Sequence, residues 1–78
     1  MSAHRSICAI AADIRREWVK VNYAAVPYLD AMMSLDKPTD RFGEDSAASI
    51  IAYFLGNATG FRGEAARALK LELKAMLK

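Results

Sequence analysis

A row of basic residues near the end of the chain is the part of the sequence best suited to bind another molecule. Arg67, Lys70, Lys74 and Lys78 follow one another at intervals of three and four residues. On a helix this spacing puts all four on one face, which could lie along the phosphates of a nucleic acid. An ordinary solvated helix face has the same pattern, and late lysines also complement the negative end of the helix dipole. Both interpretations stay open at this stage.

The residues before this row do not complete a helix-turn-helix motif. Asn57 and Arg62 stand where that motif requires apolar residues, and the basic residues come late in the last helix. Side chains that read bases in such modules lie near the start of the recognition helix. A DNA-binding regulator that uses the basic face is therefore the alternative function, and nucleic acid is the less favoured partner.

Catalytic chemistry is hard to build from this composition. The 78 residues include a single histidine, His4, and a single cysteine, Cys8, which cannot form a zinc site of the usual kind. The glycines at 56, 60 and 63 lack the preceding strand and the Lys-Ser/Thr pair of a phosphate-binding loop. We predict that the protein is not an enzyme and that it uses no cofactor.

Four carboxylates gather in the middle of the chain, at Asp36, Asp40, Glu44 and Asp45. Oxygen ligands of this kind can hold a divalent cation, but their spacing is not that of an EF-hand loop. We expect a solvated loop there, and no metal site.

Length and composition predict one small domain, residues 1–78. Hydrophobic residues make up 54% of the chain, and the formal net charge of +2 is too small to imply nucleic acid by itself. No apolar run approaches the roughly 20 residues of a membrane span, and we expect a cytoplasmic protein. The apolar surplus is either alanine on helix surfaces or a patch buried against another chain.

The periodicity of apolar residues predicts an all-α fold without a strand pair. Apolar residues recur at helical spacing in four segments, at about 5–21, 25–35, 45–57 and 60–77. Ser6 or Ser2 is the candidate N-cap of the first helix, Asp45 or Ser46 that of the third, and Thr59 that of the fourth. Residues 47–55 are apolar on nearly every side, which is typical of a buried helix. We therefore expect the third helix at the centre, with the other three packed around it.

Wide apolar arcs on four short helices predict that some apolar surface is left for a partner. The candidate protein interface lies on the second helix and at the end of the first: Tyr28, Met32, Met33, Trp18 and Val19. Methionine-rich surfaces suit adaptable recognition, although the same residues would also serve as ordinary core. The function that we favour is a small protein-protein interaction protein, self-associating as a homodimer or binding a host protein.

Two charged residues fall inside the apolar arc of the fourth helix. Arg62 and Glu72 would be costly to bury without partners. Arg15, at the edge of the apolar arc of the first helix, is a possible partner for Glu72. Partial exposure through flexible stems, or an interface at Glu72, would also explain their positions.

About two thirds of the chain resembles short uncharacterised proteins of actinobacterial phages and related mobile elements. The likeness lies in four stretches, YLDAM (28–32), FGEDSA (42–47), YFLGNATGFRG (53–63) and ARALKLELKAML (66–77). The resemblance implies a small accessory protein that acts in the bacterial cytoplasm. It assigns no activity and no functional residues.

Overall fold

The computed structural model describes residues 5–37 and 39–77, and four helices make up most of it. In chain order they are α1 (Ile7–Glu17), α2 (Val26–Met32), α3 (Ala47–Gly56) and α4 (Glu64–Met76). Between α2 and α3 lie two short strands, β1 (Arg41–Phe42) and β2 (Asp45–Ser46). The predicted succession of four helices is confirmed. His4 and Lys78 lie outside the described residues.

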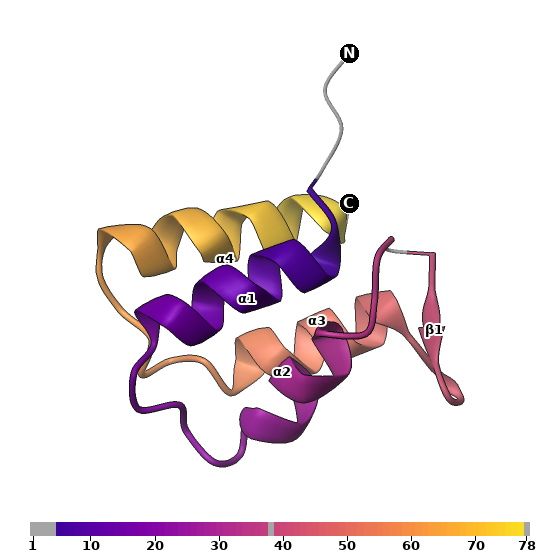
Figure 1. The fold of residues 1–78 in the computed structure, drawn as a ribbon, viewed down its shortest axis with the longest axis horizontal. Coiled ribbons are helices and arrows are strands. Elements are labelled where there is room, and N and C mark those ends of the chain that lie inside the picture. The colour runs from indigo at the N-terminus through magenta and orange to yellow at the C-terminus, as the bar shows by residue number, and fades with distance from the viewer. Residues whose placement is uncertain (1–4, 38, 78) are drawn as a thin grey trace.

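The helices pack chiefly as two pairs. α1 lies along α4, and α2 lies against α3 (Figure 1). We predicted from the sequence that the third helix lies at the centre with the other three packed around it, and this arrangement is not confirmed. Its buried residues are Ala47, Ile50, Ile51 and Phe54, whereas Ala52 and Tyr53 are exposed. One side of α3 therefore faces solvent.

α1 begins two residues later than predicted and ends four residues earlier. The Ser6 hydroxyl caps the helix by accepting a hydrogen bond from the Ala9 amide at 3.3 Å. The helix ends at Glu17 because Trp18 leaves helical geometry, with φ −99° and ψ 89°. The Trp18 ring stacks on Phe61 at 5.1 Å between centroids and meets Phe54 edge-on at 6.2 Å. This long-range aromatic cluster overrides the helical pattern that continues to Val21.

α4 begins later than the sequence predicted. Thr59 is not its N-cap: the helix starts at Glu64, after Gly63, whose φ of 110° lies outside the helical region. Glycine adopts this conformation without the steric cost that a side chain adds. The connection from residue 57 to residue 63 instead carries Phe61 onto Trp18.

The two strands correct the expectation of a fold without strand pairing. Arg41 pairs with Ser46 and Phe42 with Asp45 in a minimal antiparallel ladder. Gly43, with φ 63°, occupies the first turn position, and no other residue of this turn has positive φ. That arrangement is typical of a type II′ hairpin turn. Strands of two residues are too short to show an alternating pattern in the sequence.

Ion pairs join the start of α1 to α4. The Arg5 guanidinium donates to both carboxylate oxygens of Glu72, at 2.9 and 2.8 Å, and to Asp13 at 2.7 Å. Hydrogen bonds from Arg5 and then from Arg16 lower the pKa of Asp13. Glu72 therefore has a partner, but the predicted Arg15 is the wrong one.

Arg15 and Arg62 lie elsewhere. The Arg15 guanidinium pairs with Asp30 of α2. Arg62 is exposed, and its Nε donates to the carbonyl of Thr59 at 3.3 Å. Neither arginine enters the core. None of the helices in the described part of the chain combines the length and the apolar character needed to cross a membrane.

Candidate functional site

The predicted protein interface does not form one surface. Trp18 is 8% exposed and Met32 is fully buried, so both belong to the core and neither can meet a partner. Val19 is 86% exposed in the segment after α1, Met33 is partly exposed at the end of α2, and Tyr28 is half-buried. Trp18 and Met32 therefore pack within the chain and not against a partner.

Tyr53 is a surface residue that the sequence analysis missed. It was assigned to a fully buried helix, yet it is 53% exposed. Its ring packs on Tyr28 of α2, with centroids 5.5 Å apart. The hydroxyl of Tyr53, one of few polar groups on α3, was the signal that this side of the helix could face water.

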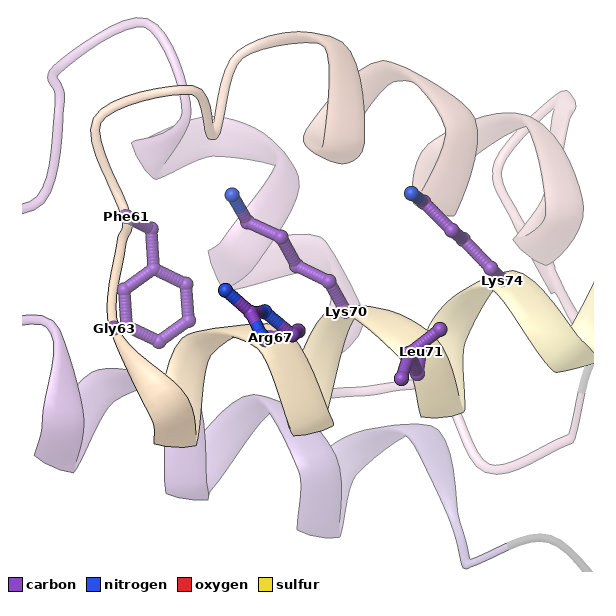
Figure 2. Close-up of a pocket in the computed structure, with 6 residues that line it drawn as sticks. All are labelled: Phe61, Gly63, Arg67, Lys70, Leu71 and Lys74. Carbon is purple, nitrogen blue, oxygen red and sulfur yellow. The ribbon is translucent and has the colours of Figure 1, made fainter.

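The basic residues of α4, in contrast, come together around one groove. Its lining consists of Arg67, Lys70, Lys74, Leu71, Phe61 and Gly63. The groove is open to solvent and has a volume of about 220 Å³. Figure 2 shows the side chains of Lys70 and Lys74 extending from α4 away from α1. Lys78, the fourth predicted basic contact, lies outside the described residues.

Helical geometry explains why these side chains converge. Residues 67, 70, 71 and 74 stand at positions i, i+3, i+4 and i+7, which share one face of a helix. A rise of about 1.5 Å per residue spreads the three cations over roughly 10 Å along the axis. The opposite face of α4, with Leu69 and Leu73, is buried. The cations therefore lie on the outer face, where packing does not require them.

No counter-charge neutralises this outer face among the described residues. The ion pairs in residues 5–37 and 39–77 are all made by Arg5, Arg15 and Arg16. The carboxylate of Glu72, on α4 itself, is bound to Arg5. Positive charge is thus concentrated in the groove.

Lys70 is the most constrained of the three cations. Its ammonium lies 5.8 Å from the centroid of the Phe61 ring, a cation–π contact. Burial, and then the charges of Lys74 and Arg62, lower the pKa of Lys70. Phe61 is in turn held by its stacking on Trp18. An anion in the groove would offset the repulsion among these cations and would meet a wall that is fixed to the core.

The start of α4 offers little for reading bases. Glu64, Ala65 and Ala68 are exposed on its first turns. Arg67, also exposed there, is the one side chain of these turns whose guanidinium can make paired hydrogen bonds to a base edge. The site can therefore hold phosphates, but a single guanidinium gives it little means to select a sequence.

One of the four carboxylates around the hairpin, that of Asp40, has a structural role. The Asp40 side chain accepts hydrogen bonds from the amides of Asp36 and Lys37, both at 3.0 Å, and these bonds lower the pKa of Asp40. Across residues 5–37 and 39–77, no three side chains among His, Cys, Asp and Glu come close enough to hold a metal ion together.

Comparisons of the chain with protein-family models, with curated proteins and with solved structures found no match. The functional argument therefore rests on the geometry of the groove.

Proposed function

We propose that the protein binds nucleic acid through the phosphate backbone, using the groove on α4. One observation carries the proposal: Arg67, Lys70 and Lys74 surround a single open groove, and none has a carboxylate partner among the described residues. Cations arranged in this way gain affinity from the counterions that phosphates release on binding. The structure thus favours the alternative function that the sequence left open.

Binding of this kind is largely independent of sequence. Phosphate contacts position a nucleic acid without reading it, and base contacts supply specificity. Three cations give modest affinity, so complexes should form at low salt and dissociate as salt rises. In this proposal the protein is a non-enzymatic accessory protein of the bacterial cytoplasm, the setting that the phage resemblance implies.

The test is a charge reversal with a matched control. Lys70→Glu combined with Lys74→Glu should abolish retention of labelled DNA at ~50 mM salt, where phosphate contacts are strong. Lys20→Glu combined with Lys37→Glu makes the same change in net charge at exposed positions outside the groove. This control should retain most of the binding. No retention by the unaltered protein at this salt concentration would refute the proposal.

Protein-protein interaction is the second candidate function, with self-association as its simplest form. Its support is the Tyr28–Tyr53 ring pair at the surface between α2 and α3, together with the partly exposed Met33. Sedimentation of the purified chain at micromolar concentration should then show a dimer, and Tyr53→Ala should weaken it. A monomer at every concentration would exclude the homodimer.

A further inference from the structure

We infer that the groove on α4 takes a phosphate monoester, the group found at a phosphorylated end of a nucleic-acid strand, between Arg67 and Lys70. The inference rests on the proposed function and adds the group that is recognised. Its basis is the unequal surroundings of the three cations. Arg67 and Lys70 lie beside the wall that the connection before α4 forms, whereas Lys74 lies away from it.

This wall belongs to the connection between α3 and α4. Phe61 and Gly63 line the groove from the connection, and the other four lining residues belong to α4. The Lys70 ammonium lies 5.8 Å from the centroid of the Phe61 ring, and the Arg67 amide donates to the Gly63 carbonyl at 2.9 Å. In Figure 2 the ends of the Arg67 and Lys70 side chains lie toward Phe61, and the end of Lys74 lies apart from them. Two cations therefore share one end of the groove, next to the wall.

The wall limits how a ligand chain can lie in the groove. Figure 2 shows the connection rising from the start of α4 on the side to which Lys70 and Lys74 extend. The Phe61 ring is almost fully buried and stacks on Trp18, so the wall is fixed to the core. A strand that follows the cations from Lys74 toward Phe61 meets this wall. The end of a strand fits there better than its middle.

The chemistry of Arg67 and Lys70 suits a terminal phosphate. A phosphate monoester carries a charge of about −1.5 to −2 at pH 7 and three strong acceptor oxygens, whereas each internal phosphate of a strand carries one negative charge. A guanidinium can bind two of these oxygens side by side, and an ammonium binds as a point charge. Burial, and then the charges of Lys74 and Arg62, lower the pKa of Lys70. A dianion offsets more of this repulsion than a monoanion does.

The size of the groove agrees with a compact group. Pockets that enclose small molecules are typically about 300–1,000 Å³, whereas this groove is smaller, about 220 Å³, and open. Gly63 leaves open space where a side chain would stand, so the wall does not crowd a phosphate beside Arg67. The rest of the strand can stay outside the groove, with its next phosphate near Lys74.

The experiment compares three strands on three proteins. Oligothymidylate with an internal label carries a phosphate at its 5′ end, at its 3′ end or at neither, and is titrated at ~50 mM salt in phosphate-free buffer. The proteins are the unaltered chain, Arg67→Gln and Lys74→Gln, and the two variants lose the same charge at different places in the groove.

We expect at least one phosphorylated strand to bind the unaltered protein roughly three- to tenfold more tightly than the unphosphorylated strand, the effect of one further charge-assisted contact. Lys74→Gln should weaken all three strands alike and preserve this difference. Arg67→Gln should make the three affinities equal.

Thymidine monophosphate, added as a competitor, separates the two sources of a phosphate monoester. A strand also contacts Lys74, so the free nucleotide should displace a phosphorylated strand only at concentrations far above those at which the unlabelled phosphorylated strand does. Displacement at equal concentrations would support the monoester site and assign it to a free nucleotide.

The remaining outcomes separate the inference from the proposed function. Equal affinity of the unaltered protein for the three strands overturns the inference and leaves the proposed function standing. A preference for the phosphorylated strand that Arg67→Gln preserves also overturns the inference, because the phosphate would then lie elsewhere. Absence of binding to every strand overturns both.

Discussion

The thirteen residues of α4 are divided between two faces that differ in character. The inner face consists of Ala66, Leu69, Leu73 and Met76, all of them buried. The outer face consists of Arg67, Lys70, Leu71 and Lys74, gathered around an open groove. Removal of apolar side chains from water stabilises the fold, and only the inner face contributes to it appreciably. The outer face is therefore free to carry charge that serves binding.

The largest change in stability is expected from a leucine on the inner face of α4, and a leucine on the outer face is its control. Leu73→Ala removes a fully buried side chain, and the free energy of unfolding should fall by about 2–5 kcal/mol. Leu71→Ala should change it by no more than about 0.5 kcal/mol. Chemical denaturation followed by circular dichroism measures both values. Similar losses for the two variants would mean that the faces of α4 are not divided as described.

A smaller loss of stability is expected from a substitution at the residue before α4. Gly63 has φ 110° and ψ 179°, a region that is nearly exclusive to glycine, so Gly63→Ala should cost about 1–3 kcal/mol of stability. Gly60→Ala, a few residues earlier, is the control, because neither its conformation nor its surroundings hinder a side chain. It should be tolerated. If Gly63→Ala destabilised the protein as little as Gly60→Ala does, that result would contradict the start of α4 at Glu64.

The smallest effect concerns the protonation of Lys70. Because its pKa is lowered in the folded state, the unfolded chain binds more protons as pH approaches the ordinary lysine value. Stability should therefore rise slightly with pH in the window just below that value, and Lys70→Gln should remove the rise. A bound phosphate should shift the pKa upward again. NMR titration of the Lys70 side chain, with and without oligothymidylate, tests both points, and an unshifted pKa in the free protein would contradict them.

Helical periodicity was sufficient to predict the four helices and the basic face. The spacing of Arg67, Lys70 and Lys74 fixes their common face wherever the rest of the chain lies, so this part of the site could be predicted. Local capping chemistry narrowed the start of each of these helices to two candidate caps, of which the structure uses Ser6 for α1 and Ser46 for α3.

The features that could not be predicted from the sequence depend on long-range packing. Trp18 leaves α1 to stack on Phe61, and this contact also sets the connection that delays α4. Local spacing cannot tell which apolar arc will meet the core, so Met32 was assigned to an interface although it is buried. The same limit concealed Phe61 as a wall of the groove.

Salt dependence tests the central claim, that the outer face of α4 binds phosphates, most directly. The affinity for single-stranded DNA is measured between ~50 and ~200 mM salt. Three phosphate contacts predict a slope of log affinity against log salt of about −2, since each contributes about 0.7 on a single strand. Lys70→Glu with Lys74→Glu should show no measurable binding anywhere in this range of salt, and in Lys20→Glu with Lys37→Glu the slope should persist. A flat slope for the unaltered protein, or the same slope in the groove variant, would contradict the account.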